Sequence, residues 1–148
     1  MSWAPHVTVA AVIEDQGRFL MVEEETPEGV RINQPAGHLE EGETLLQAVV
    51  RETGEETAYR FVPQSLIGVY RWQVPRSAAT YLRFCFDGVV TEQILDQPLD
   101  HGIIRPLWLD RSKLLEHSRQ LRSPLVLTCI DHYLAGHRYP LELLREIL

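Results

Sequence analysis

The chain has 148 residues, of which 45% are apolar and 24% are charged, and its formal net charge is −7. This composition excludes a disordered chain, a collagen-like repeat and a coiled coil as the main description, and the length predicts a single domain over residues 1–148. The acidic balance argues against a nucleic-acid polymer as partner, because neutralisation of phosphates by basic side chains dominates that affinity.

Two features of the chain bear on its compartment. Cys85 and Cys129 are its two cysteines, too few for a disulfide scaffold, so buried thiols in a reduced compartment are expected. No run of about 20 apolar residues is present to span a membrane, and the first residues lack the basic start and apolar run of a signal peptide. We therefore expect a cytoplasmic protein that does not use a membrane.

The first predicted elements are strands. His6–Ile13 is rich in valine and alanine, and Arg18–Val22 returns after a turn at Asp15–Gly17. Glu23–Arg31, which contains a proline and a glycine, is predicted to be an acidic loop. Asn33–Gly37 contains too many turn residues to be a helix.

A helix is predicted from about residue 45 to residue 57. Thr44 is a suitable N-cap, and Gln47 three residues later completes a capping-box pattern. Apolar residues then recur at helical spacing: Leu45, Leu46, Val49 and Val50.

The second half of the chain is predicted to continue with strands and then helices. Ser65–Val74 and Ala79–Val90 are β-rich and predict a hairpin, and Ile103–Leu109 predicts an edge strand because it contains a proline. Asp110–His117 predicts a short helix, and Ser123–Ala135 begins with a serine cap and a proline typical of a helix start. This order predicts an α/β fold in which a mixed sheet lies between helices.

Three glutamates lie close together near the end of the first helix. Glu55 and Glu56 follow Glu52 by three and four residues, so all three lie within about 60° on one helix face. Their mutual repulsion and the helix dipole disfavour this arrangement. Mg²⁺, with Mn²⁺ as a possible substitute, would resolve the conflict, with a carbonyl from the Gly37 loop as a further ligand. The alternative is a solvated acidic helix end.

The wider spacing around these glutamates resembles the signature of the Nudix hydrolases. Six residues match the leading and charged positions of that signature: Gly37, Glu43, Arg51, Glu52, Glu55 and Glu56. Thr53, Ala58 and Tyr59 depart from it. Ala58 replaces a glycine that would end the helix with positive φ, so this departure concerns the helix end rather than the chemistry.

The resemblance implies a Nudix fold and metal-dependent hydrolysis of diphosphate linkages. In this interpretation Glu52 and Glu56 are the principal metal ligands together with the carbonyl of Gly37. Glu55 would bind a second metal ion or hold a water of the metal, and Arg51 belongs to the same catalytic set. The acid that deprotonates the attacking water stays open among these glutamates and a nearby acid.

Two further features concern this acidic site. We expect Glu43 and Arg51 to form an ion pair that braces the helix against the preceding loop, with a solvated pair as the alternative. Many members of the family draw another acid from a loop beyond the sheet, and Asp100 is the candidate for this role here.

Other segments are similar to the NudJ-type phosphatases within that family: Pro5–Ala10, Asn33–His38, Leu82–Phe84, Leu121–Leu125 and Arg138–Glu142. This resemblance implies small pyrophosphate substrates, namely nucleoside di- and triphosphates, thiamine diphosphate and hydroxymethylpyrimidine pyrophosphate. The alternatives are a nucleotide-sugar or dinucleoside pyrophosphatase and a non-catalytic nucleotide-binding module. A monomer and a homodimer are both compatible with the sequence.

Four residues are candidates for substrate binding. Trp72, Tyr81 and Arg83 lie on the predicted hairpin, and Arg31 precedes the loop that leads to Gly37. An aromatic ring and a guanidinium suit a flat heterocycle that is joined to phosphate. Alternatively, Trp72 is a core or sheet-surface residue and Arg83 is structural.

Overall fold

The computed structural model describes residues 2–147 and contains two four-stranded sheets. The first sheet has the strand order β5-β1-β7-β6, formed by Ala36–His38, His6–Val12, Thr80–Gln93 and Tyr59–Gln73 respectively. β1 runs parallel to β7, whereas the β1–β5 and β6–β7 pairs are antiparallel. The first sheet is therefore mixed, and the short strand β5 forms one of its edges.

The second sheet is antiparallel and is built around β3 (Arg18–Thr26). β2 (Glu14–Asp15) and β4 (Gly29–Asn33) pair along one side of β3, and β8 (Ile103–Asp110) pairs along the other. The proline in β8 lies in an edge strand, as predicted, because an edge strand tolerates the missing backbone N–H.

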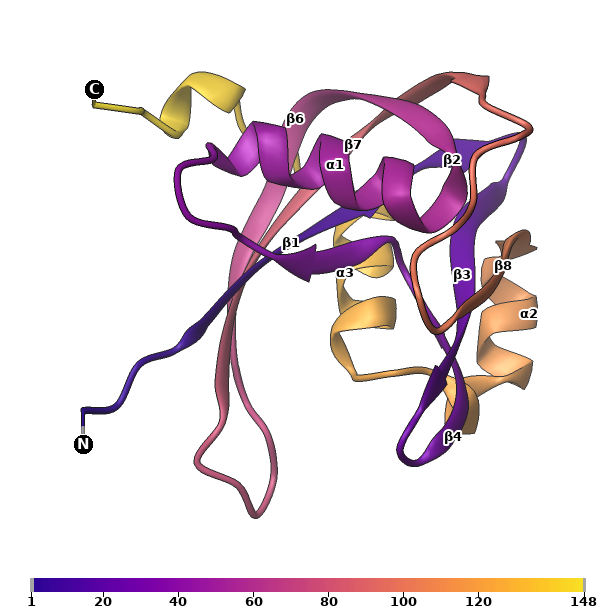
Figure 1. The fold of residues 1–148 in the computed structure, drawn as a ribbon, viewed down its shortest axis with the longest axis horizontal. Helices are drawn as coiled ribbons and strands as arrows, with labels where there is room; N and C mark the ends of the chain where they lie inside the picture. Colours follow the sequence, from indigo (N-terminus) through magenta and orange to yellow (C-terminus); the bar gives the residue numbers. More distant parts are fainter. Residues whose placement is uncertain (1, 148) are drawn as a thin grey trace.

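Helices cover both faces of the first sheet, as Figure 1 shows for α1 (Leu45–Thr57) and α3 (Leu125–Leu134). α2 (Arg111–Glu116) follows β8, and two short 3₁₀ turns span Ser118–Gln120 and Leu141–Leu143. The predicted α/β fold with a mixed sheet between helices is confirmed. Within residues 2–147, none of the helices has the length and apolar character needed to cross a membrane.

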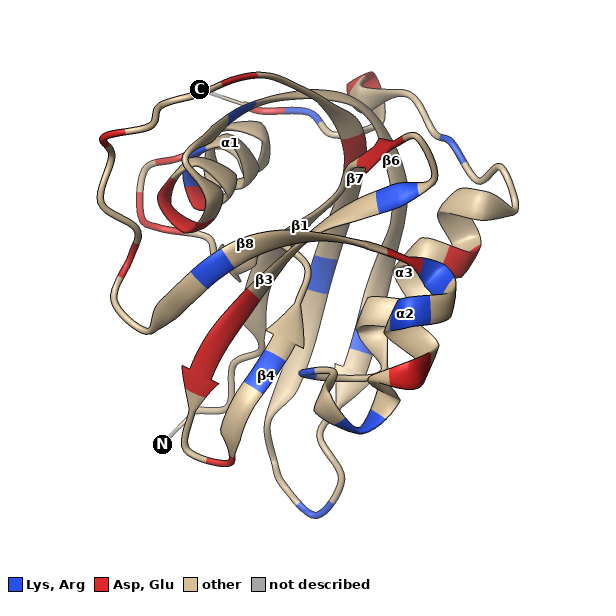
Figure 2. Cartoon of the chain, turned by 90° about the vertical axis from the view of Figure 1, so that its right-hand side faces the viewer, with Lys and Arg blue, Asp and Glu red and all other residues tan. Residues whose placement is uncertain are grey.

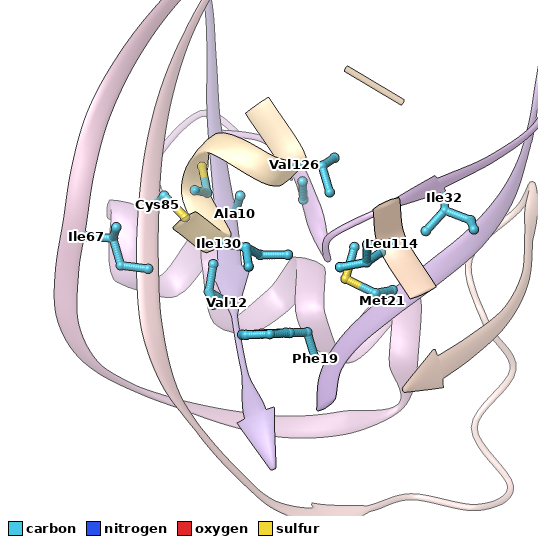
Figure 3. Packing of buried hydrophobic residues seen from close by; sticks show 12 residues of the cluster. Ala10, Val12, Phe19, Met21, Ile32, Ile67, Cys85, Leu114, Val126 and Ile130 are labelled. Carbon is cyan, nitrogen blue, oxygen red and sulfur yellow. The ribbon is translucent and has the colours of Figure 1, made fainter. Parts of the chain in front are cut away.

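The hydrophobic core consists of two clusters, one on each face of the first sheet. Alternate residues of β1 divide between them, because successive strand side chains point to opposite faces. Val9 and Ala11 pack with the apolar face of α1, whereas Ala10 and Val12 pack with α3. Figure 3 shows the second cluster, in which side chains of α3 lie against those of β1, β3 and β7.

The first helix has the predicted bounds and the predicted cap. The Oγ1 of Thr44 accepts a hydrogen bond from the backbone N–H of Gln47 at 3.0 Å, and the Gln47 side chain accepts one from the N–H of Thr44 at 2.9 Å. The helix ends at Ala58, which has the left-handed φ of 63°. The helix therefore ends with the left-handed backbone conformation that glycine favours, and this conformation is strained for an alanine.

Two predictions about the strands were wrong in part. The acidic loop predicted for Glu23–Arg31 is a hairpin, and salt bridges from Arg105 to Glu23 and from Arg122 to Glu24 offset the charge that disfavours a strand. Arg18–Val22 returns after the turn, as predicted, within the longer β3, and it joins the second sheet. β6 begins at Tyr59, well before the predicted start at Ser65, and β5 arises from the turn-rich stretch.

Candidate active site

The last two turns of α1 place three glutamates against β5. Glu52 and Glu56 are buried, whereas the Glu55 side chain is 43% exposed. A Cβ atom at Gly37 would overlap the carboxylate of Glu52, so a larger residue at this point of β5 would displace that carboxylate. The glutamate cluster therefore depends on the glycine that begins the sequence motif.

Glu56 is the most deeply buried of the three carboxyl groups. Its Oε1 accepts a hydrogen bond from the backbone N–H of Ala36 at 3.0 Å. The pKa of Glu56 is raised to about 9, mainly by burial; the hydrogen bond from Ala36 lowers it, and the nearby charges of Glu52, Glu24 and Asp100 raise it. A cation beside this carboxyl would favour its charged form.

Arg51 links the helix to the preceding loop. Its Nε and Nη2 donate to the two carboxylate oxygens of Glu43 at 3.0 and 2.7 Å, so the expected ion pair is present. Nη1 donates to Glu52 at 2.9 Å and to Glu55 at 3.2 Å, and Nη2 also donates to the carbonyl of His38 at 3.0 Å. The hydrogen bond to Glu43 is the main reason why the pKa of Arg51 is raised.

The chemistry of this cluster fits a hard divalent cation. Across residues 2–147, no three acidic, histidine or cysteine side chains are already gathered as a ready cation site, since Arg51 draws Glu52 and Glu55 toward its guanidinium. The available donors are carboxylate oxygens that lie against the backbone of Gly37, and Mg²⁺ prefers such oxygen ligands. The raised pKa of Glu56 points the same way, because its charged form lacks a positive partner.

Asp100 lies at the end of α1, although it is 44 residues or more from the glutamates in sequence. Its backbone N–H donates to the carbonyl of Glu55 at 2.8 Å, and its charge contributes to the raised pKa of Glu52 and of Glu56. Asp100 is exposed to solvent. The structure therefore brings Asp100 to the edge of the glutamate cluster.

All four candidate substrate residues line one cleft with a volume of about 420 Å³: Arg31, Trp72, Tyr81 and Arg83. Ala36 and Gly37 line it too, so the cleft reaches the strand that contacts the glutamates. The ring of Trp72 lies 6.0 Å from that of Tyr81, and within the described residues Trp72 belongs to neither core cluster. Figure 2 shows acidic segments on α1 and basic segments on β4 and β8.

Sequence reasoning missed six polar residues that also line the cleft: Thr8, Glu24, Glu28, Asn33, Arg122 and Ser123. Arg122 donates to Glu24 at 2.8 Å, and its backbone N–H donates to the carbonyl of Ile32 at 2.8 Å, which fastens the segment before α3 across β4. These residues come from separate segments and form no local motif. The one available signal was the similarity of the Leu121–Leu125 segment to the NudJ-type phosphatases. This similarity did not by itself assign a chemical role to any residue.

Comparisons with known proteins agree with this arrangement. The family model of the NUDIX domain matches residues 4–127. Phosphatase NudJ of Escherichia coli strain K12 is 45% identical over 143 residues, which cover 96% of this chain and 92% of the relative. A NUDIX hydrolase from Nitrosomonas europaea superposes with a TM-score of 0.93 at 46% identity, over 97% of this chain and 98% of its own.

A more distant structure shows the fold alone. The NUDIX domain of Shewanella oneidensis NrtR, complexed with ADP ribose, has a TM-score of 0.73 at 20% identity, over 90% of this chain and 89% of its own. Together with the glutamate cluster, these matches place the chain in the Nudix family. It is a hydrolase that acts on phosphorus-containing anhydrides, and Nudix hydrolases generally use a divalent metal ion.

Proposed function

We propose that residues 1–148 form one cytoplasmic Nudix domain that uses Mg²⁺ to hydrolyse small diphosphates. The substrates are nucleoside di- and triphosphates and thiamine-related pyrophosphates, namely thiamine diphosphate and hydroxymethylpyrimidine pyrophosphate. The observation that carries this proposal is the continuity of the cleft with β5, because Gly37 both lines the cleft and contacts Glu52. A diphosphate at β5 can therefore extend its organic group along the cleft.

The glutamates of α1 take the metal-binding role in this proposal. Glu52 and Glu56 hold the ion with the carbonyl of Gly37, and the exposed Glu55 is available to a second ion. Mg²⁺ supplies charge neutralisation for the phosphate oxygens, which is the main requirement of phosphoryl transfer. Mn²⁺ has similar ligand preferences and is expected to substitute.

Arg51, Glu43 and Asp100 complete the acidic site. Arg51 holds Glu52 and Glu55 in place through its hydrogen bonds, and Glu43 in turn orients Arg51. An acid of this group, with Asp100 included, accepts the proton of the attacking water. Rings that stack on Trp72 and Tyr81 are tolerated broadly, because every heterocycle presents a π-face.

A panel of substrates tests the proposal. Phosphate release is measured with Mg²⁺, with Mn²⁺ and with a chelator on ADP, CTP, thiamine diphosphate and hydroxymethylpyrimidine pyrophosphate, and in parallel on ADP-ribose and diadenosine tetraphosphate. We expect metal-dependent release from the first group. Preference for the second group would favour a nucleotide-sugar or dinucleoside pyrophosphatase. Binding without turnover on every compound would identify a non-catalytic module.

Size-exclusion chromatography with light scattering measures the oligomeric state under the same conditions. The proposed chemistry is complete within one chain, because the glutamates, Gly37 and the cleft residues all belong to it. A monomer and a homodimer are therefore both expected to be active.

A further inference from the structure

The cleft contains buried polar atoms that have no partner within the protein. In residues 2–147, four buried side-chain polar atoms lack a hydrogen bond: Thr8 Oγ1, Asn33 Oδ1, Thr53 Oγ1 and Arg83 Nε. Three of them belong to residues that line the cleft, and Thr53 lies in α1. Buried polar groups are almost always hydrogen-bonded, so three exceptions around one cleft call for a ligand.

Arg83 is the most unusual of these residues because its charge is buried and unpaired. It is 7% exposed, and its Nη1 donates to the neutral Oε1 of Gln34 at 3.1 Å. No carboxylate among residues 2–147 forms a salt bridge with it. Burial accordingly lowers the pKa of Arg83. A guanidinium in this state gains strongly from a hydrogen-bond acceptor.

Thr8 stands beside Arg83 on the neighbouring strand. The two residues are register partners on β1 and β7, and their side chains point to the same face of the sheet. Arg83 can only donate hydrogen bonds, and the Thr8 hydroxyl can donate one. The pair therefore offers donors to an acceptor atom of the ligand.

Asn33, on the second sheet, supplies a hydrogen-bond acceptor instead of a donor. Its Nδ2 donates to the Glu24 carboxylate at 3.5 Å, and because a carboxylate only accepts, this contact leaves Oδ1 as the free atom. A free acceptor repels phosphate oxygens but suits an N–H group. The cleft thus presents donors on one wall and an acceptor on the other.

The position of Arg83 also separates it from the acidic site. β1 lies between β5 and β7 in the sheet, so Arg83 is two strands away from Gly37, which at the usual strand spacing is about 10 Å. That distance leaves room for a phosphate and a sugar or other linker. Tyr81 precedes Arg83 by two residues on the same face, and Trp72 is the register partner of Tyr81.

We propose that Arg83 and Thr8, with Asn33 opposite, recognise the edge of a nitrogen heterocycle in the substrate, where a ring acceptor lies beside an N–H group. The inference rests on the proposed function, and it names the substrate class as diphosphates of aminated or amide-bearing rings. Arg83 and Thr8 bond the ring acceptor, and Asn33 Oδ1 accepts the N–H. The rings of Tyr81 and Trp72 form the wall beside this edge.

A matched pair of substrates tests the proposal. Cytidine diphosphate and ribose 5-diphosphate share the sugar and the diphosphate, and only the first carries a heterocyclic base. For the wild-type protein, we expect kcat/KM to favour cytidine diphosphate by roughly 10- to 100-fold, as one or two bonds to a charged donor imply. Arg83→Met should bring this ratio close to one, and Thr8→Val should reduce it by a smaller factor. Equal losses on both substrates in Arg83→Met would overturn the proposal.

Ligand protection without turnover gives an independent measurement. Without metal, cytidine monophosphate should raise the Tm of the wild-type protein more than ribose 5-phosphate does, and Thr8→Val should reduce this difference. A difference that survives unchanged in Thr8→Val and in Arg83→Met would contradict the assignment. If Arg83→Met fails to fold, Thr8→Val decides alone, since it keeps the side-chain shape and removes only the hydroxyl.

The outcomes also separate this inference from the proposed function. Metal-dependent hydrolysis of both diphosphates without ring preference would leave the hydrolase intact and remove the ring-edge assignment. Turnover of neither substrate, together with selective protection by cytidine monophosphate, would remove the proposed substrates and support the ring-edge site.

Discussion

Two arginines on opposite sides of the first sheet show how differently the protein uses the same side chain. Arg51 contacts four carboxylates, those of Glu40, Glu43, Glu52 and Glu55, at the acidic end of α1. Arg83 lies buried in the cleft with a neutral amide as its recorded hydrogen-bond partner. The α1 region has more negative charge than its arginine can neutralise, and the cleft holds a positive charge that the described chain leaves unpaired.

The comparison teaches what each region requires from outside the chain. An excess of buried carboxylates is stabilised by a cation, whereas an unpaired guanidinium is stabilised by an acceptor or an anion. A substrate that carries its phosphates to the first region and its ring to the second satisfies both at once. The predictions below either separate the two regions or test the balance of charge within one.

The largest effect is expected from Glu56→Gln. Loss of one charged metal ligand should lower kcat by about two orders of magnitude or more, because metal charge stabilisation supplies several kcal/mol. Phosphate release with Mg²⁺ measures this, and Glu41→Gln in the exposed loop is the matched control that should stay active. Near-normal turnover in folded Glu56→Gln would refute the ligand role.

The same residue should govern the stability of the metal-free protein at different pH. The pKa of Glu56 is about 9 in the folded state against an ordinary 4.5, so the folded state binds more protons between these values. The contribution of the Glu56 carboxyl to the free energy of unfolding is therefore full below about pH 4.5. It falls by a few kcal/mol as the pH rises toward 9. Urea unfolding with a chelator should show this decline in the wild-type protein and a weaker one in Glu56→Gln. An identical slope in both proteins would show that another group is responsible.

Gly37→Ala should displace a carboxylate of the acidic region, although Gly37 also lines the cleft. The added Cβ displaces the Glu52 carboxylate, and we expect a loss of about 10- to 100-fold in kcat/KM, as displaced metal ligands usually cause. Gly54→Ala is the matched control, because its Cβ would have no close neighbour and alanine favours the helix. Comparable activity in the two variants would mean that the closeness of β5 to Glu52 is unimportant.

The smallest effect concerns the end of α1. Ala58→Gly relieves the left-handed strain at φ 63° and should stabilise the protein by about 0.5–1 kcal/mol, since the greater freedom of unfolded glycine offsets part of the gain. Thermal unfolding should record a Tm increase of roughly 2 °C, with kcat unchanged. A lower Tm would indicate that the alanine methyl group contributes more by packing than it costs in strain.

The acidic region could be predicted from the sequence because its information is local. Thr44 and Gln47 define the helix start, and the spacing from Glu52 to Glu56 places the carboxylates on one face whatever the rest of the chain does. The pairing of Arg51 with Glu43 spans eight residues and connects the helix to its own preceding loop. Such short-range geometry follows directly from helical periodicity.

The cleft could be predicted only in part, because it is assembled by tertiary pairing. The hairpin supplied Trp72 and Arg83 as candidates, but Thr8 and Asn33 became neighbours of the cleft only through strand register and the packing of the second sheet. The Glu23–Arg31 stretch was misjudged for the same reason. Its glutamates are compatible with a strand because Arg105 and Arg122 form salt bridges with Glu23 and Glu24, and no local pattern reveals these distant partners.

The short strand β5 has a consequence for how this protein can diversify. Its residues alternate between the face that carries α1 and the face that carries the cleft, so three residues form the shared border of the two regions. Substitutions in the cleft can therefore accumulate without touching the glutamates, and selection on the reaction does not restrain them. Substitutions of Arg83, Thr8 or Trp72 that leave α1 unchanged would alter which substrates are bound and keep the same hydrolytic reaction.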